Sequence, residues 1–397
     1  MDTRYEFELI DTDPGLQALE AEWAQLHARN TPRNPFLSYE WTAACRQHHC
    51  PQSELYVLAA RESGQLVGLA PLRRDRSLGF HVLRFIGDGR SDYLGFLHEA
   101  RHPDVPSALL DHLEERRGEW NLAVFRQLAE PYSTLAETLL PRHLRSEEVE
   151  GTVAPHLAFS GEWDALLASG PGWLKRMAKA SRKWVKDGGS VVRVPGEEAA
   201  HYVEQIAAIE AYSWKGAEGV ARFQPGSGQE LLRQALATLA PRGEMELWLA
   251  WKDDQPVAFE INFLAPGRIW LYQGAYRTEF RKYSPGGVLD FLSIERAWKD
   301  GAREYDFMSG DEPYKAERTV AERPIRYRAL HPADVRGYLA YGLLLAPRWR
   351  LKGYPAARAA HQLWTQARSN PAAMVEGLLE SARSRLAPRA GRRATSG

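Results

Sequence analysis

The chain has 397 residues, of which 44% are apolar and 26% charged, as in ordinary globular proteins. Lysine and arginine balance aspartate and glutamate at 51 each, so no overall positive field indicates a nucleic-acid-binding protein. The two cysteines, Cys45 and Cys50, exclude a disulfide framework, and the neighbouring histidines lack convincing zinc spacing.

The first half of the chain predicts helices, a β-hairpin and further strands. Apolar residues at helical spacing, such as Leu16, Leu19 and Trp23, define the first helix. A polar loop at 87–92 follows the third strand. The predicted ranges are helices 13–28, 40–48 and 104–117, hairpin 55–74, and strands 81–86 and 120–127.

The second half predicts a similar order of elements. Its helices are expected at 161–169, 171–186, 197–213, 227–239 and 286–300, and its strands at 245–251, 256–264, 268–276 and 303–308. Alternating helices and antiparallel strands predict mixed α/β layers. We expect domains at 1–155 and 156–330, and a basic helical tail at 331–397 whose end is disordered.

Charge is distributed unevenly along the chain. Residues 331–397 hold eleven lysines and arginines against three acidic residues. Such a tail is expected to pack on the acidic body or to lie on a membrane surface. No signal peptide and no apolar run of membrane-spanning length are present, so we expect a cytoplasmic protein, with peripheral attachment to the inner membrane as an open alternative.

Two segments about 190 residues apart resemble each other. Residues 55–72 and 246–263 each give a strand, a tight polar turn and a second strand. In this alignment Ala70 corresponds to Glu260. Shared ancestry of the two halves explains the matching flanking order, although any two hairpins look somewhat alike.

The turn Arg281–Leu289 opens the helix predicted at 286–300. Pro285 and Gly286 pre-set the turn and permit close approach to the backbone. The first amides of a helix have no internal partner, so they suit a phosphate or pyrophosphate. Arg281 and Lys282 add positive charge.

Two further segments contain chemically useful side chains. Glu260 lies in a strand whose apolar residues point to the opposite face; it is either a general base with a raised pKa or a carboxylate on a solvated face. After the strand at 303–308, a turn delivers Tyr314 and Lys315. A tyrosine can protonate a leaving group, and a lysine can stabilise an oxyanion.

Several motifs together resemble the GNAT acyltransferase superfamily, in its CelD/BcsL-like (BioF2-like) branch, which is similar in turn to the FemABX-type transferases. The resemblance covers roughly residues 20–320. The motifs that carry it lie in these segments: 34–41, 91–96, 213–216, 256–260, 272–276, 280–289 and 306–315.

The resemblance implies two tandem GNAT-like domains, each a mostly antiparallel sheet flanked by helices, with the active site in the second. It implies acetyl-CoA as donor and no metal, with the pantetheine arm between strands 256–264 and 268–276. The glycine loop departs from the family pattern, because it lacks the second spaced glycine. The donor-binding residues would be Tyr276, Arg281, Tyr283, Ser284, Gly286 and Gly287.

The resemblance also suggests catalytic residues. Lys315 falls where FemABX-like proteins carry a catalytic lysine, and Glu260 would match the carboxylate base on the fourth strand of other GNAT enzymes. Tyr314 and Asp306 complete the catalytic set, and the acceptor would contact Asp92, Trp214, Lys215 and Asp311. Simpler interpretations stay open: a turn at Asp92, a packing tryptophan at Trp214, and a solvated basic helix at 175–186.

Three functions follow from this sequence. The first is an N- or O-acyltransferase acting on a saccharide or a biosynthetic intermediate of the envelope or exopolysaccharide. The second is a FemABX-like transferase that uses aminoacyl-tRNA, which the basic helix favours. The third is a non-catalytic protein of a polysaccharide-synthesis complex.

Overall fold

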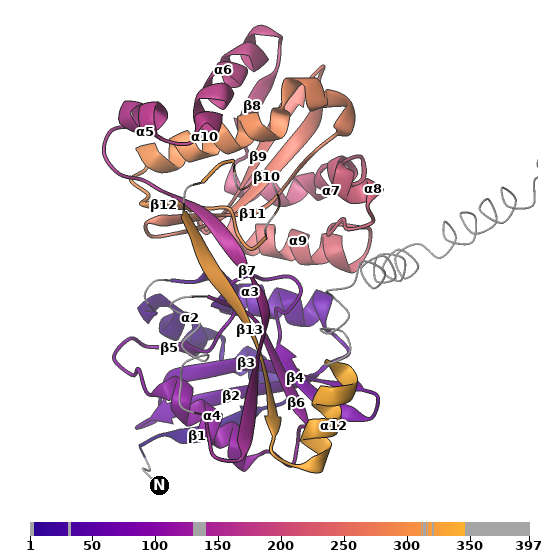
Figure 1. The fold of residues 1–397 in the computed structure, drawn as a ribbon. Coiled ribbons are helices and arrows are strands. Elements are labelled where there is room, and N and C mark those ends of the chain that lie inside the picture. The colour runs from indigo at the N-terminus through magenta and orange to yellow at the C-terminus, as the bar shows by residue number, and fades with distance from the viewer. Residues whose placement is uncertain are drawn as a thin grey trace, which may run out of the picture.

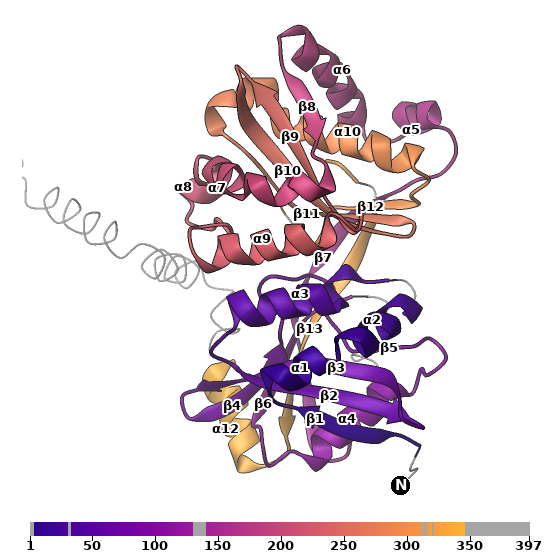
Figure 2. The ribbon, with the colours of Figure 1, turned by 180° about the vertical axis from the view of Figure 1, so that it is seen from behind.

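The computed structural model describes residues 4–30, 33–129, 140–310, 312, 315, 317–319 and 321–345. These residues form two lobes (Figures 1 and 2). Their strands belong to a single 13-stranded sheet that runs through both lobes and carries helices on its faces. The predicted mixed α/β fold with a mainly antiparallel sheet is confirmed.

The N-terminal lobe has a sheet of four consecutive antiparallel strands followed by a parallel one. Its strands are β1 (Glu6–Ile10), β2 (Glu54–Glu62), β3 (Gln65–Ser77), β4 (Phe80–Phe85), β5 (Leu97–His98) and β6 (Leu122–Ala129). Its helices are α1 (Asp13–Ala18), α2 (Glu20–Arg29), η1 (Pro35–Leu37), α3 (Tyr39–Ala44), η2 (Cys45–His49) and α4 (Val105–Glu115).

The second lobe repeats this topology. Its strands are β8 (Ser190–Arg193), β9 (Met245–Lys252), β10 (Gln255–Ala265), β11 (Arg268–Tyr276) and β12 (Glu304–Asp306). Its helices are α5 (Trp163–Ser169), α6 (Gly172–Lys186), η4 (Gly196–Tyr202), α7 (Val203–Ala211), α8 (Trp214–Ala217), α9 (Ser227–Leu239), η5 (Thr278–Tyr283) and α10 (Pro285–Lys299). In each lobe a helix, α4 or α10, precedes the parallel strand, so the two halves share one architecture.

Two long strands are exchanged between the lobes. β7 (Leu144–Ala158) follows the first half in sequence but pairs with β12 of the second lobe. β13 (Ala321–Pro332) follows the second half but pairs with β6 of the first. The two strands also pair with each other, and they cross from lobe to lobe in Figure 1. α12 (Val335–Leu344) then packs on β13 and β6. The domain boundaries remain a prediction.

The helices of the second lobe divide between the two faces of its sheet. α10, with α6 packed on it, covers one face through Val288 and Leu289. On the other face lie α7 and α9, and a core continuous with the N-terminal lobe contains Phe259 and Phe263. Phe263 packs edge-on against Trp41 of α3. Within the described residues, no helix combines the length and apolarity that crossing a membrane requires.

Candidate active site

β11 has an edge that its neighbour leaves open. β11 and β12 pair only from Arg268↔Glu304 to Trp270↔Asp306. Beyond Trp270, no strand in the described part of the chain pairs with this edge of β11, which continues to Tyr276. β10 and β11, in contrast, stay paired from Ala258↔Tyr276 to Ala265↔Arg268. The prediction that the pantetheine arm lies between strands 256–264 and 268–276 is therefore wrong, because these two strands stay paired. A tight hairpin with Gly267 at φ +79° holds those two strands together, whereas α10 separates β11 from β12 in sequence.

The backbone at Gly274 faces this open edge. Arg277 N donates to the Val257 carbonyl at 2.9 Å, which makes Ala258↔Tyr276 a non-hydrogen-bonded pair. Two residues along, Glu260↔Gly274 is of the same kind, so the Gly274 carbonyl points away from β10. A Cβ added to Gly274 would meet, outside its chain neighbours, only the Phe259 carbonyl oxygen at 3.4 Å. The face of the sheet at Gly274 therefore has room for a Cβ.

Lys215 occupies the open edge. Its Nζ donates to the Gly274 carbonyl at 2.9 Å, and Ser213 caps the short helix α8 that carries it. Burial, opposed by the negative charge of Glu210 and reinforced by the positive charges of Arg222 and Lys315, lowers the pKa of Lys215 to about 8. Trp214 is 38% exposed, with the Lys215 ammonium 5.9 Å from its ring centroid. A cation therefore lies where a donor following β11 would pass.

The residues predicted to bind the donor gather at the start of α10. Ser284 adopts the left-handed conformation with φ 51°, and α10 begins at Pro285. A Cβ on Gly286 would approach the Tyr276 ring at 3.2 Å, and one on Gly287 would come within 2.5 Å of Met177 Sδ on α6. Gly287 thus permits the close contact of two helices.

The flanking residues of this turn make aromatic and cationic contacts. The ring of Tyr283 lies edge-on to Trp184, and the Lys252 ammonium stands 5.4 Å from its centroid. Arg281 is exposed. The helix start therefore combines unpaired amides with nearby positive charge, as anion sites do.

Asp306, at the end of β12, links the two lobes. Its Oδ2 accepts from Tyr93 OH and Arg323 Nη1, both at 2.6 Å, and its Oδ1 accepts from Met308 N at 2.7 Å. Burial raises the pKa of Asp306, while Arg323 opposes that shift. Both carboxylate oxygens are therefore occupied by donors from β13, the 91–96 segment and the strand end.

Lys315 and Asp92 meet at Ser309, just beyond β12. Lys315 is 5% exposed; its Nζ donates to the carbonyls of Met308 at 3.3 Å and Ser309 at 2.9 Å, and pairs with Glu312 at 3.0 Å. Asp92 accepts from Ser309 N at 3.1 Å. Burial raises the pKa of Asp92, and Arg222 and Lys315 counteract this. Tyr314 and Asp311 lie outside the described residues.

Glu260 belongs to a different network, beneath α10. It is 1% exposed, which contradicts the interpretation as a carboxylate on a solvated face. Its Oε1 accepts from Asn262 Nδ2 at 2.7 Å and Tyr305 OH at 2.8 Å. Burial, and then the negative charge of Asp290, raise its pKa well above the usual range. Because β8 precedes β9, Glu260 lies on the third strand of its lobe, not the fourth.

Asp290 connects this network to the segment that carries Lys315. Its Oδ2 pairs with Arg318 Nη1 at 2.5 Å, and the Arg318 guanidinium lies 4.9 Å from the Trp173 ring centroid. An ion pair thus joins α10 to the segment that follows Lys315.

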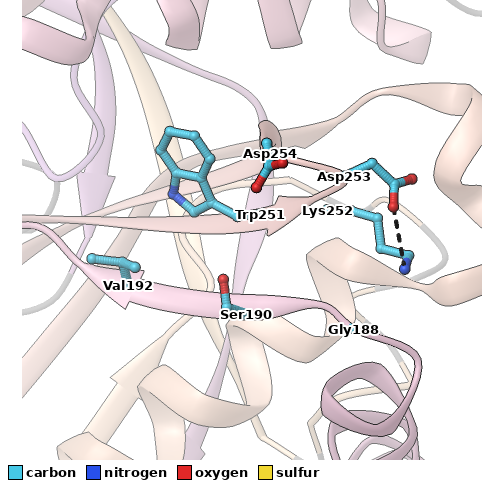
Figure 3. A pocket seen from close by; sticks show the side chains of 7 residues that line it. All are labelled: Gly188, Ser190, Val192, Trp251, Lys252, Asp253 and Asp254. Carbon is cyan, nitrogen blue, oxygen red and sulfur yellow. Dashed lines mark ion pairs between the residues drawn. The ribbon is translucent and has the colours of Figure 1, made fainter.

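A pocket lies at the edge formed by β8 and β9 (Figure 3), and Lys252, which lines it, also contacts the Tyr283 ring. Its volume is about 330 Å³, and in Figure 3 the Lys252–Asp253 ion pair lies at one end with Trp251 toward the other. It contains none of the predicted site residues; its lining is Gly188, Ser190, Val192, Trp251, Lys252, Asp253 and Asp254. Within the described ranges, no cluster of three or more His, Cys, Asp or Glu side chains is placed to hold a metal ion.

Sequence reasoning missed several residues of the site. Tyr93 was in a family-like motif but received no role, and its contact with Asp306 joins positions 213 residues apart. Arg323 and Asp290 gave no local signal, because their partners come from distant strands and loops. Arg222, whose charge acts on Asp92 and Lys215, lies in an irregular segment after α8.

The chain resembles a known protein family and several solved structures. Residues 174–316 match the model of the acetyltransferase (GNAT) domain. The crystal structure of FemX is similar over 85% of this chain and 99% of its own, with a TM-score of 0.57 and 14% identity.

Two further solved structures share the fold. The C-terminal domain of a proposed lysylphosphatidylglycerol synthetase from Agrobacterium fabrum covers 83% of this chain and 97% of its own (TM-score 0.51, 13% identity). A conserved protein of unknown function from Bacteroides thetaiotaomicron covers 82% and 100% (TM-score 0.51, 13% identity). No curated protein matches the sequence significantly. The chain thus carries a domain of the GNAT superfamily over residues 174–316, within a fold related to that of FemX.

Proposed function

We propose that the protein is an acyltransferase whose donor lies along the open edge of β11, with its phosphate groups at the start of α10. The observation that carries this proposal is the Gly274 carbonyl, which faces the side that β12 leaves free. An extended donor arm that contains amides can bond to such an edge as an added strand does. Acetyl-CoA is the simplest donor of this shape, and GNAT domains generally use it.

Lys215 is the residue that the donor meets first. A donor amide that bonds to the Gly274 carbonyl displaces the Lys215 ammonium, which then lies beside the thioester. The acceptor nitrogen or oxygen attacks the carbonyl carbon, and the charge that develops on the carbonyl oxygen is stabilised by this cation. Collapse breaks the carbon–sulfur bond, the acyl group stays on the acceptor, and the proton that the acceptor loses balances the one that the thiolate takes up.

Residues of both lobes are proposed to hold the acceptor and shape its site. Asp92 is the partly exposed carboxylate at the end of β12 and is suited to bind or deprotonate a hydroxyl or amino group. Lys315 secures the strand end against which Asp92 is held. Glu260, buried beneath α10, holds a proton with Asp290 and supports the donor helix. The half-exposed Trp214 suits a sugar ring, in keeping with a saccharide acceptor.

A second donor, aminoacyl-tRNA, is favoured by α6. Six lysines and arginines of this helix are exposed, and the helix packs directly on the start of α10. A polyanionic donor would use this basic face in addition to the helix amides. The exposed residues are Lys175, Arg176, Lys179, Arg182, Lys183 and Lys186.

Calorimetric titration of the purified protein with acetyl-CoA and, separately, with an aminoacyl-tRNA mixture tests both donors. The proposal expects acetyl-CoA to bind and to raise the melting temperature. In Lys215→Met, which leaves the Gly274 carbonyl free, we expect acetyl-CoA to bind at least as tightly as in the wild type. Binding of aminoacyl-tRNA alone, weakened by Lys179→Gln and Arg182→Gln, selects the second donor. Failure of both ligands to bind would contradict the proposed acyltransferase activity and favour a non-catalytic role.

A further inference from the structure

One helix of the N-terminal lobe turns an apolar face to solvent. α12 packs on β13 and β6 through its opposite side, where Ala340 is buried and His331 stacks on Tyr341. Its outward side chains are large and apolar: Val335 is 75% exposed, Leu339 49% and Leu343 57%, and Tyr338, which is 53% exposed, lies at their margin with its ring edge-on to His331. Their spacing of three and four residues places them in a single stripe.

The charges around this stripe are positive. Asp334 precedes the helix but already caps it by accepting from Gly337 N at 2.8 Å. Arg336 is exposed beside the stripe. The sequence that continues from the helix, residues 346–397, holds ten lysines and arginines against two glutamates.

We propose that the outer face of α12 docks the protein on an anionic lipid surface. An apolar helix face inserts its side chains into the headgroup boundary, while adjacent basic residues attract anionic lipids. The charge argues against a second copy as the occupant, because two basic continuations would come together.

This surface is separate from the candidate active site. α12 lies on the N-terminal lobe, whereas the open edge of β11 and the start of α10 lie in the other lobe (Figure 1). The docked protein would therefore keep its donor site accessible to water-soluble ligands, and its acceptor would be near a membrane.

Co-sedimentation of the full chain with vesicles tests the proposal. The vesicles contain phosphatidylcholine alone or phosphatidylcholine with about 30% phosphatidylglycerol. The wild type should bind the anionic vesicles and should be released by salt. The variant Val335→Ser/Leu339→Ser/Leu343→Ser should bind about tenfold more weakly or worse, since it loses the inserted apolar area. Arg348→Gln/Arg350→Gln/Lys352→Gln should also bind more weakly.

A matched control removes exposed apolar side chains elsewhere. Leu78, Val192 and Val220 are 77%, 43% and 48% exposed and lie outside α12. Their triple serine variant should bind like the wild type. The proposal is overturned if the wild type ignores anionic vesicles, if it binds neutral vesicles equally well, or if both triple serine variants behave alike. A dimer in sedimentation velocity that only the α12 variant dissolves, without vesicle binding, would assign the stripe to a second copy instead.

Discussion

At the scale of single residues, two buried carboxylates differ in role: Asp306 connects the two lobes, and Glu260 holds a proton. Asp306 is satisfied by donors from three segments and joins the lobes. Glu260 accepts two hydrogen bonds and shares its surroundings with a second carboxyl, that of Asp290. Both were predicted to be catalytic from their position in the sequence, and those roles remain predictions.

Replacing Asp306 should destabilise the whole protein. Asp306→Ala removes one of the two carboxylates that pair with Arg323, leaving Glu304 at 2.9 Å. It also takes the acceptor from the Tyr93 hydroxyl and the Met308 amide, and the expected cost is about 3–5 kcal/mol. Tyr93→Phe removes one hydrogen bond and keeps the ion pair, so it should cost about 1.5–3 kcal/mol. Urea denaturation at neutral pH measures both. Equal losses in the two variants would show that the ion pair has no special weight.

Glu260→Gln should change how stability depends on pH. The folded pKa of Glu260 is raised, so the folded protein keeps a proton that the unfolded chain releases as pH rises above about 4.3. The contribution of Glu260 to wild-type stability therefore falls as pH rises from its unfolded to its folded pKa, by about 1.4 kcal/mol for each pH unit. The glutamine variant lacks this loss. Its stability relative to wild type should be higher at pH 8 than at pH 5, with Glu197→Gln, at an exposed site, as control.

At the scale of elements, α6 and α10 approach each other closely at the start of α10. Gly287 makes this contact possible, because its position lies against Met177. The turn proposed to bind the donor phosphates and a helix–helix contact thus coincide at Gly287.

Gly287→Val should test that contact. Its side chain would overlap Met177 Sδ, and overpacking of this kind typically costs about 1–3 kcal/mol. In the double variant Gly287→Val/Met177→Ala, the loss should be smaller than the sum of the single losses. Thermal denaturation of the four proteins gives the coupling energy. Simple additivity would mean that the two residues do not compete for space.

The long, periodic elements could be predicted from the sequence. The helix predicted at 227–239 is α9 with the same bounds, and both hairpins and the helix after the glycine turn are confirmed. β8 was missed because its four residues are mostly exposed and show no alternation. β7 was missed because charged residues such as Arg145 and Glu147 interrupt it.

The open edge of β11 could not be predicted from local pattern. It depends on the short pairing of β11 with β12, and α10 separates these two strands in sequence. Most donor-side residues are contiguous in sequence and were found together, whereas Asp306 contacts Tyr93 in a distant loop and Arg323 in β13, which no periodicity connects.

At the scale of the whole molecule, the exchanged strands make each lobe depend on the other. β7 completes the sheet of the second lobe and β13 that of the first. Two lobes connected in this way are expected to unfold together, unlike domains joined by a flexible linker.

Gly151→Ala should destabilise both lobes at once. Gly151 lies where β7 crosses β13, and a Cβ there would come within 1.7 Å of the Ile325 carbonyl oxygen, a backbone atom that cannot move alone. We expect a loss of about 3 kcal/mol or more, with far-ultraviolet circular dichroism and tryptophan fluorescence keeping one common transition. Two separate transitions in the wild type, or in the variant, would contradict this dependence.

The central claim is that an acyl donor lies along the open edge of β11. Calorimetric titration of acetyl-CoA into the wild type and into Gly274→Val tests it most directly. The valine side chain fits the strand, since its Cβ meets only one backbone oxygen, at 3.4 Å, outside its chain neighbours. It also stands beside the carbonyl that the donor would use. The account predicts binding to the wild type and a loss of about tenfold or more in Gly274→Val at an unchanged melting temperature. Equal affinities in the two proteins would contradict it.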